Sequence, residues 1–82
     1  MDRIAMLRTF IIDELSADPA DLERTDTRLV EEDVIDSLGI FLLVDFIENR
    51  FSVEVDPEEI RIENFATLAA IDAFVERTLK AS

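Results

Sequence analysis

The pair Asp36-Ser37 is the part of this sequence whose residue types and spacing best suit a chemical reaction. Apolar residues follow it at mostly helical spacing as far as Phe51. We expect Asp36 to be a helix N-cap, because its carboxylate can accept from first-turn amides at the positive end of the helix dipole. Ser37 then takes the first helical position, where its hydroxyl is exposed beside backbone N–H groups that lack internal partners. This position is suited to a phosphate ester.

Side chains for catalysis are scarce in the rest of the chain. The 82 residues include no cysteine, histidine, tyrosine or tryptophan, and Lys80 is the single lysine. The sequence therefore lacks the usual general base, the commonest metal ligand and any thiolate. An EF-hand counted back from Gly39 would begin at Val34, which cannot bind calcium, so we expect no metal site. These absences predict a protein that carries a substrate, not an enzyme.

The net charge is −12, and it is unevenly distributed. Residues 31–63 hold eleven acidic side chains against two arginines, a net charge of −9, whereas residues 64–82 are neutral. Such a chain does not suit nucleic acid, whose phosphates need lysine and arginine. The acidity is compatible with a solubilising surface and equally with recognition of basic protein partners. The chain has no apolar run of about 18 residues, so we expect no membrane span and a cytoplasmic protein.

The apolar spacing predicts an all-α fold, a small bundle of three longer helices and one short helix. The longer helices are expected over residues 2–15, 37–50 and 67–79, with Asp2 capping the first and Thr67 the last. A long loop, pinned to the core by Leu22, Leu29 and Val34, joins the first two. Residues 51–55 alternate like a strand but have no second strand to pair with, so we expect an extended link. The short helix is predicted over residues 56–62, capped by Asp56, with a break at 64–67. One domain, residues 1–82, accounts for the whole chain.

The helix after Ser37 has more apolar residues than one face can hold. One stripe is assigned to the core: Ile40, Leu43, Val44, Ile47 and Phe51. A second group falls outside this stripe, and an exposed contiguous apolar surface usually has a purpose. We assign Leu38, Phe41 and Leu42, with Asp45 among them, to a partner-binding surface; the alternative is a helix buried on most sides. Phe46 is expected to touch the long loop.

Asp36-Ser37-Leu38, with its following helix, closely resembles the phosphopantetheine attachment motif of acyl and peptidyl carrier proteins. The Asn-Phe-x-Thr stretch at residues 64–67 is also similar, and the resemblance extends from the first helix to about Leu79. It implies that 4'-phosphopantetheine is esterified to Ser37, supported by Asp36, and holds an acyl or aminoacyl group as a thioester. Ser16, Ser52 and Ser82 serve as controls, because none combines an acidic cap with a following amphipathic helix.

The resemblance also implies a set of partners. They are a phosphopantetheinyl transferase, an acyl- or aminoacyl-loading ligase and downstream acyl-transfer or tailoring enzymes, acting on a monomeric carrier. Val34-Ile35 before the motif and Gly39 after it look more like free-standing aminoacyl, D-alanyl or peptidyl carriers than fatty-acid carriers. Asp33 departs from the pattern, since such carriers often place glycine there. The competing hypothesis is a small acidic helical interaction module without covalent cargo.

Overall fold

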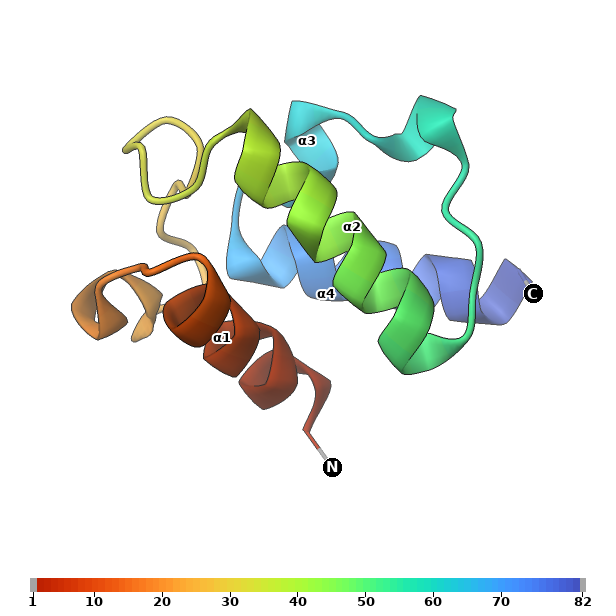
Figure 1. The fold of residues 1–82 in the computed structure, drawn as a ribbon, viewed down its shortest axis with the longest axis horizontal. Helices are drawn as coiled ribbons and strands as arrows, with labels where there is room; N and C mark the ends of the chain where they lie inside the picture. Colours follow the sequence, from red (N-terminus) through yellow and green to blue (C-terminus); the bar gives the residue numbers. More distant parts are fainter. Residues whose placement is uncertain (1, 82) are drawn as a thin grey trace.

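The computed structural model describes residues 2–81 as a compact arrangement of helices (Figure 1). The longer helices are α1 (Arg3–Glu14), α2 (Ser37–Phe51) and α4 (Leu68–Ala81), and α3 (Ile62–Phe65) is short. Short 3-10 turns, η1 (Pro19–Leu22) and η2 (Pro57–Glu59), lie in the connections. Within residues 2–81 there is no strand, so the predicted all-α bundle is confirmed. No helix in this range has the length and apolar character needed to cross a membrane.

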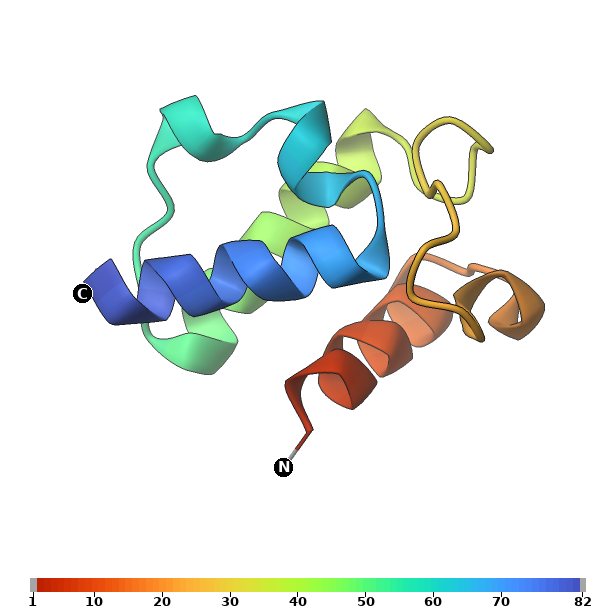
Figure 2. The same cartoon turned by 180° about the vertical axis from the view of Figure 1, so that it is seen from behind.

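Helix α4 runs along the back of the bundle and organises the core (Figure 2). Its inner face buries Leu68, Ile71, Phe74 and Val75, which leave at most 2% of their surface exposed. The ring of Phe74 packs against Phe65 from α3, with centroids 5.4 Å apart. Helix α1 packs closely on α4, and an ion pair of 2.6 Å from Arg3 Nε to Asp72 Oδ1 joins the two. The hydrogen bond that Arg3 donates to the Asp72 carboxylate raises the pKa of Arg3.

The long loop between α1 and α2 is fastened to α3 and α4 by its backbone. Leu29 N–H donates to Ala66 O at 2.8 Å, and Ala69 N–H donates to Thr25 O at 3.0 Å. Leu22 and Leu29 are buried, which confirms two of the three predicted pins. The same bonds explain how a loop of about twenty residues keeps a defined path, because each saturates a backbone group.

The third predicted pin, Val34, packs against the core but is only half-buried, and its neighbour Ile35 is the fully buried residue. The cause lies one residue earlier, at Asp33, whose φ of 56° is in the left-handed region. This turn directs the N–H groups of both Val34 and Ile35 at Leu29 O, at 2.8 and 3.1 Å. Burial therefore passes to Ile35, the residue directly before the Asp36 cap.

The segment between α2 and α4 corrects the predicted short helix. Asp56 caps it as expected, with Glu58 N–H donating to Asp56 Oδ1 at 2.9 Å, but the chain makes only the single turn η2. The side-chain amide of Asn64 donates to Glu59 O at 2.7 Å. A continuing helix would need the same carbonyl oxygen as a backbone acceptor. The helix α3 starts later, at Ile62, and includes residues 64 and 65, which were predicted to be a break. Its last residue is buried Phe65.

Candidate functional site

The start of α2 has the geometry that its sequence predicts. Asp36 is the N-cap, in extended conformation, and its Oδ1 accepts from Gly39 N–H at 2.8 Å. The Asp36 carbonyl accepts from Ile40 N–H at 3.0 Å and closes the first turn. Ser37 is the first helical residue and is exposed. Its hydroxyl therefore lies at the positive end of a 15-residue helix, beside first-turn amides that no intrahelical acceptor can satisfy.

The control serines lie at the opposite kind of position. Ser16 directly follows α1 and its cap Leu15, and Ser52 is the C-cap of α2; both are exposed and left-handed, with φ of 58° and 55°. Carbonyl groups and the negative end of the dipole dominate helix C-termini, so a phosphate ester is disfavoured there. Ser82 lies outside the described residues. Among residues 2–81, Ser37 is thus the serine placed at a helix N-terminus.

Helix α2 has a buried and an exposed apolar face, as predicted. Ile40, Leu43, Val44 and Ile47 are buried, whereas Leu38, Phe41 and Leu42 are 66%, 60% and 44% exposed. The exposure of these three residues is confirmed, and their role with partners stays a prediction. Phe51, assigned to the core stripe, is only half-buried because it ends the helix next to the left-handed turn at Ser52.

Phe46 was predicted to touch the long loop, and the structure gives it a different neighbour. Its ring stacks on Phe10 from α1, with centroids 4.3 Å apart and planes inclined by 21°. The aromatic pair joins α1 to α2. The spacing on one helix does not show which element packs beside it, so this neighbour was not predicted, and a contact between Phe46 and the long loop stays a prediction.

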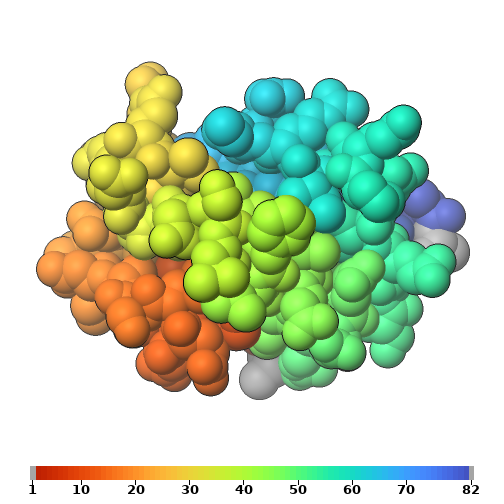
Figure 3. Space-filling model, turned by 45° about the horizontal axis from the view of Figure 1, so that its top comes forward, coloured from red at the N-terminus to blue at the C-terminus, as the bar shows by residue number. Residues whose placement is uncertain are grey.

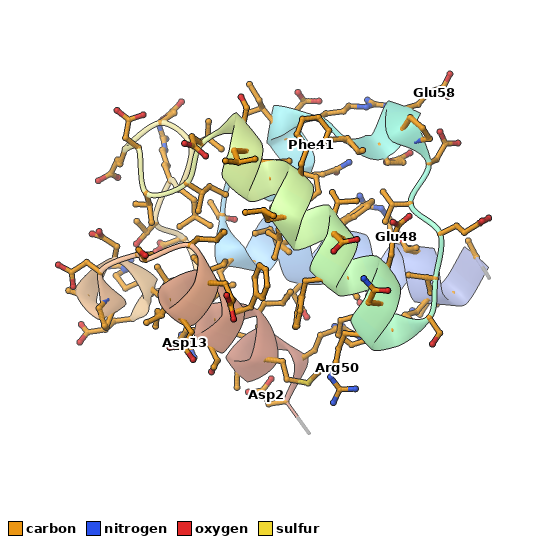
Figure 4. All side chains as sticks on the ribbon, viewed as in Figure 1. Asp2, Asp13, Phe41, Glu48, Arg50 and Glu58 are labelled. Atoms are coloured by element: carbon orange, nitrogen blue, oxygen red, sulfur yellow. The ribbon has the colours of Figure 1, made fainter. Side chains whose placement is uncertain are left out.

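The exposed apolar residues of α2 lie on different flanks. Leu38 and Leu42 line a hollow on the α1 side, together with Leu15. Phe41 points away from α1, toward the side where α3 lies (Figure 4). The sequence reasoning missed Ile62, which is 59% exposed at the start of α3. The available signal was its helical spacing from Phe65, three residues later. The predicted short helix ended at Ile62, so the prediction did not use that spacing.

Gly39 is buried by its own chain. A methyl group at Gly39 would lie 3.4 Å from Leu15 Cδ1 and 3.5 Å from Ile35 Cβ, which is ordinary van der Waals contact. An alanine would therefore fit between the first turn of α2 and the end of α1, so the packing among the described residues does not by itself require glycine here.

Charges around the site are mostly negative. Asp33, Asp36 and Asp45 are exposed on or before α2. In the preceding loop, Arg24 is paired with Asp26 and Arg28 with Glu31, each at 2.9 Å. These pairings raise the pKa of both arginines, and hydrogen bonding from Arg24 lowers the pKa of Asp26. The loop cations are thus held by local acids, and the field at the start of α2 remains negative.

Comparison with known proteins agrees with the resemblance seen in the sequence. No protein-family model matches the chain. The chain is 36% identical over 76 residues to a probable acyl carrier protein, PigG, of a Serratia species, covering 88% of this chain and 87% of that protein. It is 29% identical over 76 residues to an acyl carrier protein of Helicobacter hepaticus, covering 93% of this chain and 96% of the relative.

Both matches cover most of the chain, and both relatives are named as acyl carrier proteins. A carrier protein is in agreement with the helical bundle and with the scarcity of catalytic side chains. The chain therefore belongs to the acyl carrier protein family: it is a non-catalytic carrier that uses covalently attached 4'-phosphopantetheine and works with transferases and acyl-processing enzymes.

Proposed function

We propose that Ser37 is the attachment residue and that residues 1–82 form one carrier domain, which presents an acyl or aminoacyl thioester to partner enzymes. The observation that carries this proposal is the position of Ser37. It is exposed at the start of α2, after a cap whose carboxylate bonds the Gly39 amide at 2.8 Å. Ser16 and Ser52 lie at helix C-termini instead.

The residues around Ser37 fit a phosphodiester. The first turn of α2 supplies backbone N–H groups and the positive end of its dipole, both of which favour a phosphate. Because Ser37 and its neighbours Asp36 and Leu38 are exposed, a long substituent on Oγ can extend into solvent without displacing the core. When bound, the group supplies a thiol that forms the thioester with the cargo.

The loading reaction uses Ser37 as the nucleophile. Its Oγ forms a bond to the pantetheine-side phosphorus of coenzyme A, the pyrophosphate P–O bond breaks, and adenosine 3',5'-bisphosphate leaves. The serine proton passes to a base of the transferase, which also supplies the metal. The role of Asp36 is to fix the helix start that presents Ser37, since its carboxylate already accepts the Gly39 amide.

The cargo that the sequence favours is aminoacyl or peptidyl. Val34-Ile35 and Gly39 flank the motif, in place of the residues expected of fatty-acid carriers. A loading ligase would then charge the thiol, and tailoring enzymes would act on the bound group. The mass of the protein purified from its own host, with whatever the thiol carries, tests this point, because a simple fatty-acyl mass would contradict it.

The partner surface of this function is the exposed side of α2 around Ser37. Leu38, Phe41 and Leu42 supply apolar contacts, and Asp45 supplies charge between them. A basic, partly apolar enzyme surface is complementary to this pattern, and its binding should weaken as salt screens the charges.

The attachment proposal is tested by mass spectrometry. The protein is incubated with coenzyme A, magnesium and a broad-specificity phosphopantetheinyl transferase, and it should gain one phosphopantetheinyl mass. Ser37→Ala should gain none, whereas the matched control Ser52→Ala should gain as much as the unaltered protein. Modification of Ser37→Ala would refute the assignment. If several transferases leave the unaltered protein unmodified, that result would favour the competing hypothesis of an interaction module without covalent cargo.

A further inference from the structure

Three adjoining hollows follow the seam between α1 and α2. The first, of about 560 Å³, lies between the end of α1 and the start of α2, and Leu15, Leu38 and Leu42 are among its apolar lining residues. The second, of about 310 Å³, shares Glu14 and Leu42 with the first. The third, of about 360 Å³, shares Phe10, Glu14 and Phe46 with the second. The shared residues place the three hollows in a row along the seam, and this row is named here the α1–α2 furrow.

The floor of the second and third hollows is apolar. Phe10 and Phe46 stack across it and are both half-buried. Met6 extends the floor toward one end, and Leu42, which is 44% exposed, forms a wall. This aromatic pair joins α1 to α2, and the hollows lie on either side of it.

The rim of the furrow is acidic. Asp13 and Glu14 border it from α1, Asp45 borders it from α2, and Asp33 and Asp36 border its first hollow. Figure 4 shows Asp13 on α1, on the near side of the molecule as drawn. Arg50 is the one cation among the described lining residues, at the end opposite Ser37. An apolar floor with an acidic rim is complementary to a cationic amphipathic segment.

The size of the furrow fits a short helix. Along α2 it runs from Leu38 to Arg50, which is about 18 Å at a rise of about 1.5 Å per residue. A helix of about three turns covers that length. Its apolar stripe would contact Leu42 and the Phe10–Phe46 pair, with lysine or arginine on both sides of the stripe facing the acidic rim.

We propose that the α1–α2 furrow extends the proposed partner surface from Leu38, Leu42 and Asp45 onto α1, and that it binds a basic amphipathic helix belonging to a partner enzyme. The aromatic part of the furrow lies on a different flank of α2 from Phe41, since Phe41 and Phe46 are about 140° apart around the helix. The proposal rests on the proposed function only in naming the partner as an enzyme that acts on the carrier.

The surface of the molecule supports this separation of flanks. In Figure 3, α1 and the first half of α2 adjoin on one side, and α3 borders α2 on the other. Phe41 and Ile62, the exposed apolar residues toward α3, are absent from the lining of all three hollows. The two flanks can therefore be altered independently.

The experiment is a titration of the isotope-labelled, unmodified protein with a designed peptide. The probe is a capped 14-residue helix with leucines on one face and lysines beside them; its control has the same composition in an order without an amphipathic face. Amide NMR shifts should move for residues along the furrow and stay in place around Phe41 and Ile62. The scrambled peptide should bind at least about tenfold more weakly, because it cannot present one apolar stripe.

Matched variants locate the site. Leu42→Ser and Glu14→Lys should each weaken binding of the amphipathic peptide about tenfold or more, whereas Phe41→Ser and Glu63→Lys on the α3 flank should leave it unchanged. Both furrow variants should fold, because Leu42 and Glu14 are exposed and a lysine suits the last turn of α1. Ser37→Ala should bind normally, so the outcome does not depend on the attachment proposal.

Several outcomes would overturn the furrow assignment. They are undetectable binding at millimolar peptide, equal binding of the scrambled peptide, and shifts centred on the α3 flank. Furrow shifts that appear with rising protein concentration alone would show that a second copy of the chain occupies the furrow.

Discussion

Helices α2 and α4 have nearly the same length, 15 and 14 residues, but they use their apolar side chains differently. On α4 the large apolar residues face inward, and alanine or charged side chains occupy the outer positions, among them Ala73 and Glu76. On α2 a complete inner face is accompanied by Leu38, Phe41 and Leu42 on the outside. These extra apolar residues are the basis for our proposal that α2 docks partner enzymes as well as packing in the core.

The difference has an energetic cause. The inner face of α2 already contributes Leu43 and Ile47 to the core, so the exposed residues add little to folding. Exposed leucine and phenylalanine also raise the risk of association, which a carrier with a net charge of −12 limits by repulsion. The high net negative charge thus offsets the risk of association that the exposed apolar surface creates.

The largest expected effect on stability comes from truncating a phenylalanine of α4 to alanine, and a phenylalanine of α2 gives the comparison. Phe74→Ala removes a buried ring in contact with Phe65 and should lower the free energy of unfolding by about 3–5 kcal/mol. Phe41→Ala removes a ring that is 60% exposed and should change it by no more than about 0.5 kcal/mol. Urea unfolding measures both. Equal losses would show that α2 has no separate docking face.

Adjacent residues of α2 allow the same comparison within one helix. Leu43→Ala should cost about 2–5 kcal/mol, because Leu43 is fully buried. Leu42→Ala should cost far less and should impair docking in the furrow instead. The free energy of unfolding and the peptide affinity are measured on the same samples. A Leu42→Ala protein with lost stability and unchanged peptide affinity would place Leu42 in the core.

The N-caps give the next effect. Asp36→Ala and Thr67→Ala each remove a side-chain acceptor, from Gly39 N–H at 2.8 Å and Ala70 N–H at 3.0 Å, and each should cost about 1 kcal/mol. Only Asp36→Ala should also slow phosphopantetheine transfer, since only this cap presents the attachment serine. Transfer is followed by intact mass over time.

Asp36→Asn separates the two contributions of that cap. Its side-chain oxygen can still accept the Gly39 amide, so stability should remain near that of the unaltered protein. A transfer rate that also recovers would show that Asp36 acts by positioning. A rate as slow as that of Asp36→Ala would show that the transferase needs the carboxylate charge, and it would contradict a role through helix geometry.

Much of the contrast between α2 and α4 can be predicted from the sequence, because helix caps and apolar periodicity depend on residues that are close together in the chain. The caps Asp2, Asp36, Thr67 and Asp56 were each predicted, and each accepts the expected backbone amide. The buried stripe of α2 followed from its helical period, apart from Phe51. Ser37 is proposed as the attachment residue because a cap and an exposed hydroxyl are encoded within two residues and because this motif resembles that of carrier proteins.

The features that the sequence did not predict have two causes. Some depend on residues distant in the chain, as when Phe46 stacks on Phe10 across a long loop. Others are local but irregular, as when the Asn64 side chain reaches back to Glu59 and delays the start of α3. The furrow requires both helices to be in place, so no single stretch of sequence could reveal it. Pairing between elements is set by the whole fold, which a periodicity on one helix does not contain.

The smallest expected effect concerns how the chain enters α2. Asp33 is left-handed with φ of 56°, a conformation that costs an ordinary residue about 1–2 kcal/mol and glycine very little. Aspartate tolerates it better than most, and glycine loses about 0.5–1 kcal/mol through its freer unfolded chain. Asp33→Gly should therefore stabilise the protein slightly, by about 0.5 kcal/mol, whereas Asp33→Ala should destabilise it by about 1 kcal/mol.

A third variant removes the influence of charge from this test. Asp33→Asn keeps the shape and the tolerance of left-handed backbone but removes one negative charge from the acidic segment, so it isolates the electrostatic share. Urea unfolding at low and at physiological salt should give the order glycine, asparagine, alanine at both. The entry to α4 offers the contrast, because Ala66 has φ of −66° and no left-handed residue lies there. An alanine variant as stable as the glycine variant would mean that the turn before α2 is unstrained, and the preference for glycine at this position would then need another explanation.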